Sequence, residues 1–190
     1  TKFEHKGKSL YPVINKRLKS GEVNIKDDYV RFDMMQQFGA FITESSGHLS
    51  EYLPFYRKRK DLIDKYCGAG YNGGTSFYAD NWPKWRQDGD MWRTEFANGE
   101  HQDWEVKRSW EYCSYVIEAI EMNRPFVMYS TVPNTGLISN LPQDGVVEVA
   151  CHCDKNGVVP TYYGALPPQM AAICDWNMRC YELAAQACID

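Results

Sequence analysis

A polar cluster between residues 43 and 52 is the part of this 190-residue sequence best equipped for chemistry. Its key members are Glu44, Ser45, Ser46 and His48. Small hydroxyls beside a glycine are typical of a helix start, whose exposed backbone N–H groups can bind oxygen-rich or anionic ligands. His48, one turn further on, can act as an acid or base near neutral pH. The structural alternative is that the serines cap a helix and that Glu44 complements its dipole.

Two further sets of polar residues have a functional and a structural interpretation. Glu44 and Glu51 are seven residues apart and could share a helix face, like the paired carboxylates of most glycosidases, although two solvated glutamates are commoner. Asn134 and Asn140 lie in a Gly- and Pro-containing segment that predicts a loop. Their amides suit the recognition of hydroxyls, and they suit turns equally well. Both interpretations stay open at this point.

The cysteines favour a structural interpretation. Cys151, His152 and Cys153 have the residue types of a metal site, but alternate residues of a strand point to opposite faces, which leaves only the two thiols together. The chain has seven cysteines, an odd number, scattered among apolar neighbours. This pattern predicts reduced and mostly buried thiols rather than a disulfide framework.

The elements that must position these residues are helices interspersed with a few antiparallel strands, which predicts an α+β fold with one domain. Apolar periodicity, Gly and Pro signals predict helices over residues 11–19, 27–38, from Ser45 or Ser46 to about 56, 109–124 and 168–188. Strands are predicted over residues 126–132 and 146–153, with an Asn-Gly turn leading to a third at 158–159. Pro54 is expected to kink the third helix or to begin it.

Residues 68–99 show no clear periodicity and predict a long loop. They include Trp82, Trp85 and Trp92, which could stack on sugar rings or fill a core or interface. The aromatic residues from 82 to 104 therefore leave a non-catalytic carbohydrate-binding module open as an alternative.

Composition narrows the class of protein. A formal charge of -4, from 25 acidic and 21 basic residues, offers no basic field for nucleic acid. No apolar stretch approaches the length of about 20 residues that spans a bilayer, and no signal peptide is recognisable, which predicts a cytoplasmic protein without a membrane partner. The alternation of residues 1–5 is like the continuation of a strand, so we expect the natural chain to begin further upstream.

Several segments match one known family in order. They are residues 2–7, 41–52, 54–58, 134–142, 147–149, 157–160 and 164–167. Together they resemble glycoside hydrolase family 4, in particular its melibiase-like α-galactosidase branch. The resemblance spans nearly the whole chain.

The resemblance implies an NAD- and Mn-dependent enzyme with an N-terminal Rossmann domain and a C-terminal domain related to that of lactate and malate dehydrogenases. Residues 1–190 would be the C-terminal domain, which binds substrate and supports homo-oligomers. The Rossmann domain is absent from this chain, since no Gly-rich strand–helix turn occurs, and the metal ligands belong upstream. No metal ligand is therefore expected here.

The implied reaction hydrolyses an α-glycosidic bond by oxidation and elimination. NAD takes hydride from C3, a base removes the acidified C2 proton, the aglycone leaves, and water addition reverses the steps. The small-molecule substrate is expected to be an α-galactoside, with α-glucosides or uronides as alternatives. A pure interaction domain would contact no sugar.

The resemblance also implies roles for single residues. Phosphosugar members of the family carry a tyrosine base at the position of His48, so His48 would replace that base or bind a hydroxyl. Glu44, Ser45 and Ser46 would line the substrate beside it. Asn134 and Asn140 would line the neighbouring loop.

Overall fold

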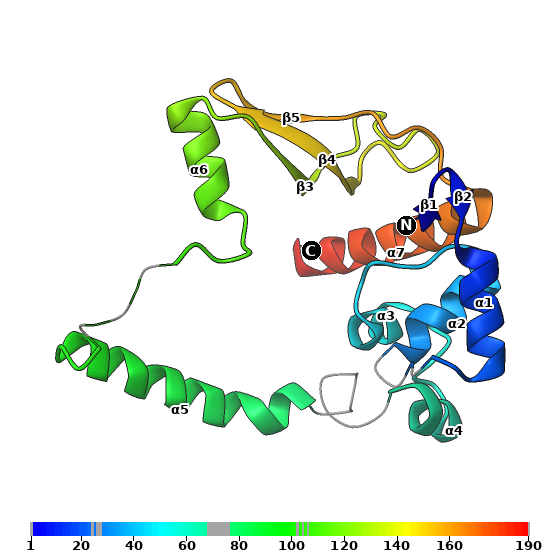
Figure 1. The fold of residues 1–190 in the computed structure, drawn as a ribbon, viewed down its shortest axis with the longest axis horizontal. Coiled ribbons are helices and arrows are strands. Elements are labelled where there is room, and N and C mark those ends of the chain that lie inside the picture. The colour runs from blue at the N-terminus through cyan, green and yellow to red at the C-terminus, as the bar shows by residue number, and fades with distance from the viewer. Residues whose placement is uncertain are drawn as a thin grey trace. The chain divides into compact units, whose positions relative to one another are not determined.

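The computed structural model describes residues 2–23, 25, 28–67, 77–101, 103, 105 and 107–189. The chain forms two compact units, Thr1–Trp104 and Glu105–Asp190 (Figure 1). The first unit contains β1 (Glu4–His5), β2 (Lys8–Ser9), α1 (Tyr11–Ser20), α2 (Tyr29–Phe38), α3 (Ser46–Tyr52), α4 (Lys60–Leu62), the π-helical turn η1 (Ile63–Cys67) and α5 (Phe77–Ala97). The second contains α6 (Cys113–Met122), β3 (Phe126–Pro133), β4 (Val146–Asp154), β5 (Gly157–Pro160) and α7 (Pro168–Ile189). The fold is α+β, as the sequence predicts.

Helices α1 and α2 end where the sequence signals place them. Gly21 and Gly39 follow α1 and α2 with φ angles of 74° and 82°, the left-handed conformation that glycine adopts without strain. Leu53 is extended because it precedes Pro54, so α3 stops before the proline. The predicted helix to about residue 56, kinked at Pro54 or begun by it, is therefore wrong. The predicted start of α2 at residue 27 lies outside the described residues.

A partly buried polar network joins α2 to η1. The Tyr56 hydroxyl donates to Asp33 Oδ2 at 2.8 Å, and the Tyr66 hydroxyl donates to Asp33 Oδ1 at 3.3 Å. Burial and the neighbouring Asp33 carboxylate raise the pKa of Tyr56 well above its usual range. The apolar side chains of Val30 and Met34 are buried on α2.

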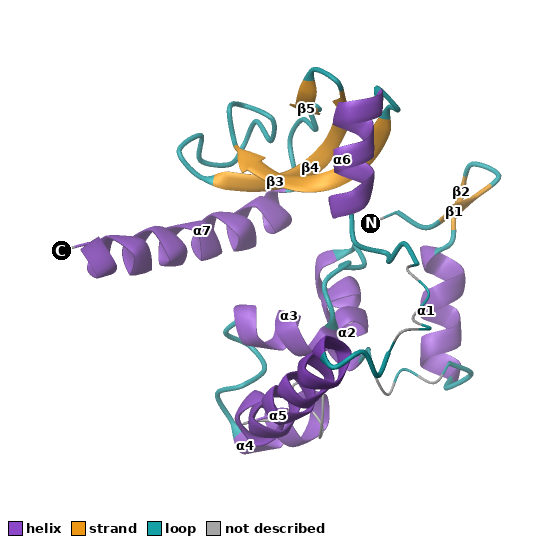
Figure 2. Ribbon diagram, turned by 90° about the vertical axis from the view of Figure 1, so that its left-hand side faces the viewer, coloured by secondary structure: helices purple, strands orange, loops and turns teal. Residues whose placement is uncertain are grey.

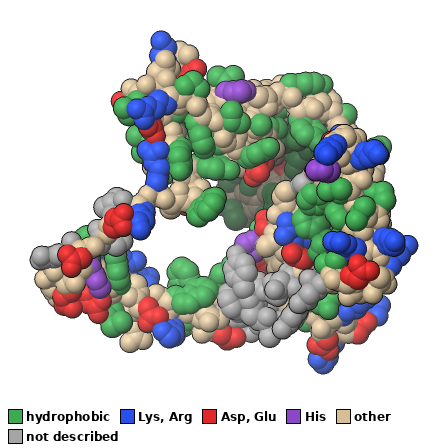
Figure 3. All heavy atoms as spheres, in the orientation of Figure 1, with side chains coloured by type: hydrophobic (Ala, Val, Ile, Leu, Met, Phe, Trp, Pro, Cys, Tyr) green, Lys and Arg blue, Asp and Glu red, His purple; other side chains and the backbone are tan. Residues whose placement is uncertain are grey.

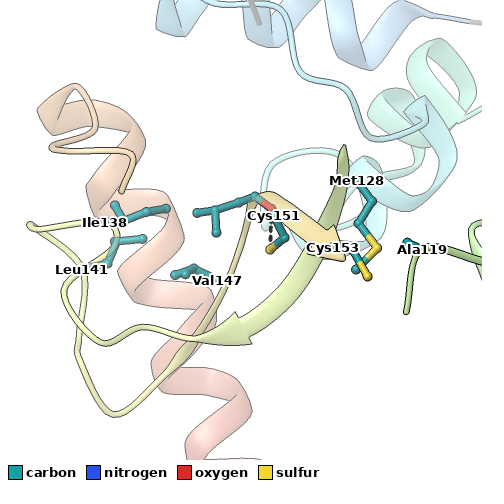
Figure 4. Packing of buried hydrophobic residues seen from close by; sticks show 8 residues of the cluster. Ala119, Met128, Ile138, Leu141, Val147, Cys151 and Cys153 are labelled. Carbon is teal, nitrogen blue, oxygen red and sulfur yellow. Dashed lines mark hydrogen bonds between the residues drawn. The ribbon is translucent and has the colours of Figure 1, made fainter. Parts of the chain in front are cut away.

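The second unit is built on a three-stranded antiparallel sheet of order β3-β4-β5. Strand β4 alternates, with Val147, Val149, Cys151 and Cys153 buried and His152 exposed. Its register places Met128 opposite Cys151, and Gly157, with a φ of 100°, turns the chain into β5. The buried residues form one apolar cluster with Ala119 of α6 and the loop residues Ile138 and Leu141 (Figure 4). The predicted strands and hairpin are confirmed.

Helices α6 and α7 complete this core. Helix α6 packs on β3 and β4, and the first half of α7 contributes Ala171, Cys174 and Met178 to the cluster. The second half of α7 extends beyond the sheet (Figure 2). The predicted cap of α6 is wrong: Ser109 Oγ accepts a hydrogen bond from the Glu111 N–H at 3.2 Å, and the helix begins only at Cys113.

The long loop predicted over residues 68–99 is wrong from residue 77 onward, and its first residues, 68–76, lie outside the described part of the chain. Phe77–Ala97 is one helix of 21 residues. Its described side chains include none that is buried, so the helix shows no one-sided burial pattern to detect. Ion pairs along it, such as Lys84–Asp88 at 2.5 Å and Arg86–Asp90 at 3.3 Å, support it locally.

Among the described residues, no helix is both long and apolar enough to cross a membrane.

Candidate active site

Two serines build the start of α3. Ser45 is the N-cap, and its Oγ accepts a hydrogen bond from the His48 N–H at 3.4 Å. Ser46 is 3% exposed, and its Oγ accepts a hydrogen bond from the backbone N–H of Arg31 at 3.4 Å. Arg31 lies in the first turn of α2, where backbone N–H groups lack an intrahelical partner. The serines therefore hold α3 in place, as their structural interpretation predicts.

His48 lies between an acid and a phenol. Its Nδ1 is 3.2 Å from Glu44 Oε1, and its Nε2 is 3.4 Å from the Tyr78 hydroxyl of α5. Glu44 Oε1 also accepts a hydrogen bond from the Ser45 N–H at 2.7 Å, which anchors the carboxylate at the helix start. The side chains of His48 and Glu44 are 32% and 39% exposed, so the group is open to solvent and to a ligand.

The chemistry of these groups sets the direction of the hydrogen bonds. An ionised Glu44 can only accept, so it favours a proton on His48 Nδ1. This tautomer leaves the Nε2 lone pair toward Tyr78, whose hydroxyl can donate. At 3.4 Å the contact with Tyr78 is long and therefore weak. Nε2 can give it up and accept a proton from a bound molecule instead. The arrangement is that of a histidine base oriented by a carboxylate.

Arg31 fixes the segment that leads into this site. Its Nε donates to the Ile42 carbonyl at 2.9 Å, and its Nη2 donates to the Thr43 carbonyl at 3.3 Å. Its guanidinium also pairs with Asp28 at 3.0 Å and lies 4.3 Å from the Phe41 ring centroid. One side chain of α2 thereby fixes the position of the backbone that leads directly into Glu44.

Glu51 does not join Glu44. It forms an ion pair with Arg57 at 3.4 Å, and Arg57 Nε donates to Ser50 Oγ at 3.0 Å. Glu44 instead binds His48 and the start of its own helix. The two carboxylates therefore bind different residues, which argues against a catalytic carboxylate pair.

Asn134 and Asn140 belong to the second unit, where both bind backbone. Asn134 is fully buried; its Nδ2 donates to the carbonyls of residues 138, 141 and 142, and its Oδ1 accepts a hydrogen bond from the N–H of residue 138. Exposed Asn140 makes a reciprocal pair of 2.9 Å bonds with the backbone of Leu166. This geometry favours the turn interpretation, and direct substrate contact by either residue stays a prediction.

Only three of the seven cysteines are buried, namely Cys67, Cys151 and Cys153, so the prediction of mostly buried thiols is wrong. Cys151 and Cys153 are fully buried in β4, while His152 is exposed, as the alternation predicts. The structure shows all seven cysteines as free thiols. The described part of the chain has no cluster of three His, Cys, Asp or Glu residues able to hold a metal ion. Its strands of two or more residues pair only antiparallel, unlike the parallel sheet that binds dinucleotides, so these residues do not fit Mn or NAD by themselves.

Sequence reasoning missed Tyr78 and Arg31. Tyr78 lies 30 residues from His48 in a segment predicted as a loop, so no local spacing linked the two. Arg31 lies on α2 within a mixed polar and apolar pattern, and only the folded chain brings it to residues 42 and 43.

Comparison with known proteins places this chain in one family. The chain is 37% identical over 187 residues to an α-galactosidase of Bacillus subtilis, covering 96% of this chain and 41% of that protein. It also resembles the crystal structure of the Bacillus subtilis lplD protein, with a TM-score of 0.71 and 24% identity over 98% of this chain and 44% of the other.

A second solved structure is a 6-phospho-α-glucosidase from gut microorganisms in complex with NAD and Mn2+. Its TM-score is 0.55 at 21% identity, covering 86% of this chain and 38% of that one. This chain thus spans less than half the length of each of these proteins. Residues 1–190 match the model of the family 4 glycosyl hydrolase C-terminal domain, and the chain belongs to that family.

Proposed function

We propose that this chain is the substrate-binding C-terminal part of an α-galactosidase that acts by NAD- and Mn-dependent oxidation and elimination. Membership of family 4 and the 37% identity to an α-galactosidase support the reaction and the sugar. The observation that carries the site is His48 held between Glu44 and Tyr78. The fold of helices packed on a small antiparallel sheet is also consistent with a domain related to the one that follows the Rossmann fold in lactate and malate dehydrogenases. The implied NAD and the seven free thiols favour the reducing cytoplasm.

In this proposal His48 Nε2 receives the C2 proton of the sugar, or binds the hydroxyl beside it. Glu44 keeps the ring oriented and stabilises its charged form while the proton is held. Ser45 and Ser46 act by fixing α3, and the site's exposure gives the sugar access. Asn134 and Asn140 hold the loop of residues 134–142 through their bonds to backbone.

We place the NAD and Mn sites outside this chain, because its described residues supply neither a metal cluster nor a dinucleotide fold. The hydride acceptor and the metal supply the oxidation and the charge stabilisation of this chemistry. The 190-residue chain by itself is therefore expected to hydrolyse no glycoside. Turnover by this chain would contradict the placement of the NAD and Mn sites outside it.

The class of reaction and the sugar can be tested together. The full-length protein that carries this chain is assayed with nitrophenyl α-galactoside, α-glucoside and α-glucuronide, with and without NAD, Mn2+ and a reductant. We expect α-galactoside hydrolysis that needs both cofactors. A preference for α-glucoside or α-glucuronide would show that the enzyme belongs to a different branch of the family. Sugar binding without turnover of any of the three would favour a carbohydrate-binding module instead.

The role of His48 has its own test in the full-length enzyme. His48→Ala should lower kcat on the order of a hundredfold, the usual contribution of a general acid or base, with little change in the melting temperature. A C2-deuterated substrate should show an isotope effect that is preserved or enlarged in the variant. His152→Ala is the control, because His152 is an exposed histidine of β4. Full specific activity in a destabilised His48→Ala protein would show that His48 is structural.

A further inference from the structure

Arg31 of α2 holds both ends of the short segment that carries Glu44. Its side chain binds the carbonyls of residues 42 and 43, with Nε donating at 2.9 Å and Nη2 at 3.3 Å. Its backbone N–H donates to Ser46 Oγ at 3.4 Å, at the first residue of α3. Glu44 and Ser45 therefore lie between two points that are fixed to one residue of another helix.

Two further contacts fix the guanidinium of Arg31 itself. Its Nη1 donates to Asp28 Oδ1 at 3.0 Å, and its Cζ lies 4.3 Å from the centroid of the Phe41 ring. The Arg31 side chain is 22% exposed. Because a guanidinium is planar and its donors form a fixed fork, binding all these groups leaves it one orientation. The two carbonyls that it binds are therefore held in one place relative to α2.

The position of this segment decides where the Glu44 carboxylate lies. Glu44 Oε1 accepts a hydrogen bond from the Ser45 N–H at 2.7 Å and lies 3.2 Å from His48 Nδ1. Hydrogen bonds weaken steeply with distance and angle, so a shift of residues 42–44 by about 1 Å is enough to break the contact with His48. The orientation of His48 thus depends on a residue that lies 17 positions earlier in the sequence.

The charge of Arg31 does not by itself explain an arginine at this position. Asp28 pairs with it at 3.0 Å and neutralises it. Positive and negative side chains are intermixed on the face of the first unit that Figure 3 displays, so charges there act through local pairs rather than as a field of one sign. The donors that Asp28 does not bind are used on the carbonyls of residues 42 and 43. The role of Arg31 is therefore geometric.

We propose that Arg31 is a positioning residue of the candidate active site, which acts on His48 only through Glu44. By fixing residues 42–46 it keeps the Glu44 carboxylate at His48 Nδ1. The carboxylate in turn keeps the proton on Nδ1 and the lone pair on Nε2, where the substrate proton is received. The proposal rests on the role of His48 in the proposed function, and it adds that the competent tautomer is set from α2.

The first test measures the tautomer of His48 and needs no turnover. Nitrogen-15 NMR of the histidine rings in the full-length protein, at an alkaline pH where the imidazole is neutral, distinguishes a proton on Nδ1 from a proton on Nε2. The spectrum of His48→Ala assigns the signal. We expect the Nδ1–H tautomer in the wild type, and a loss of about half of its population or more in Arg31→Ala.

Asp33→Ala is the matched control for this measurement. Asp33 lies on the same helix as Arg31, but it binds Tyr56 and Tyr66 instead of the segment that carries Glu44. This change should lower the stability of the protein and leave the tautomer of His48 as it is in the wild type. An unchanged tautomer in Arg31→Ala, or a proton on Nε2 in the wild type, would overturn the proposal.

The second test is a double-mutant cycle on whichever nitrophenyl glycoside the full-length enzyme hydrolyses. Arg31→Ala should lower kcat about thirtyfold, the scale on which a small misplacement of a catalytic group acts, and leave KM within about twofold. In a Glu44→Ala background the same change should lower kcat by less than about twofold, because a residue that acts only through Glu44 then has nothing to position. Equal losses of kcat in the two backgrounds would show that Arg31 acts independently of Glu44 and would refute the proposal.

Arg31→Lys carries the same two tests if Arg31→Ala does not fold. Lysine keeps the charge opposite Asp28, but its single nitrogen cannot reproduce the planar fork that binds Asp28 and two carbonyls at once. We expect kcat to fall about tenfold in this variant, and wild-type kcat would show that charge alone is sufficient, against the proposal. If the full-length protein hydrolyses no glycoside, the proposed reaction fails, while the tautomer of His48 still decides the role of Arg31.

Discussion

Replacing Asn134 by alanine should test whether this residue is structural. The side chain is fully buried, and its bonds to backbone are between 2.9 and 3.2 Å long. Its two amide hydrogens are shared among three carbonyls, and its oxygen accepts one hydrogen bond from an N–H group. The substitution therefore removes about three full hydrogen bonds. A buried group left without its partner costs about 1–3 kcal/mol, and a total of about 4 kcal/mol is expected.

Urea unfolding followed by far-UV circular dichroism measures this loss. With a slope of about 2 kcal/mol per molar, the midpoint should fall by about 2 M. Asn140→Ala is the matched control, because exposed Asn140 makes only its pair of bonds to Leu166 and should cost about 1 kcal/mol or less.

Asn134→Asp adds a pH test of the same geometry. A carboxylate there would face three carbonyl oxygens at a buried position, so its pKa in the folded state should lie above the unfolded value. Its stability should then be greatest at low pH and fall as the pH rises through the folded pKa. A stable Asn134→Ala protein that has lost only its activity would refute the structural role and favour direct contact with substrate.

Three further outcomes follow from the structure. Burial and the Asp33 carboxylate raise the pKa of Tyr56 above its ordinary value of 10.0, so this tyrosine stabilises the fold fully below pH 10 and less as the pH rises further. Tyr56→Phe should flatten the loss of unfolding free energy above pH 10 in chemical denaturation, and an unchanged slope would argue against the buried phenol. Ser45→Ala removes the N-cap of α3 and should cost about 1 kcal/mol; a neutral substitution would show that the 3.4 Å bond contributes nothing. In native protein a thiol reagent should label exposed cysteines quickly and buried ones only on unfolding, while burial raises the pKa of Cys174 and slows its reaction. The exposed set is Cys113, Cys180 and Cys188, and the buried set is Cys67, Cys151 and Cys153; peptide mapping of the label checks both.

The sequence by itself determined the features that depend on neighbouring residues. Glycine alone adopts a φ of 74° or 82° without strain, so the ends of α1 and α2 could be predicted. The alternation in β4 determined that Cys151 and Cys153 are buried, because side-chain direction in a strand follows from residue parity. The cap by Ser45 likewise joins residues three apart.

The tertiary structure decided what depends on distant partners. The segment predicted as a loop is the helix α5; Pro83 and Gly89, two poor helix formers, lie inside it, so local composition indicated a loop. Tyr78 meets His48 only once this helix has formed, and Arg31 meets residues 42 and 43 only when α2 and α3 pack. Asn134 could equally have bound a sugar hydroxyl or backbone, since an amide offers both donors and an acceptor. The fold decided between them, because it surrounds the buried amide with the carbonyls of residues 138, 141 and 142.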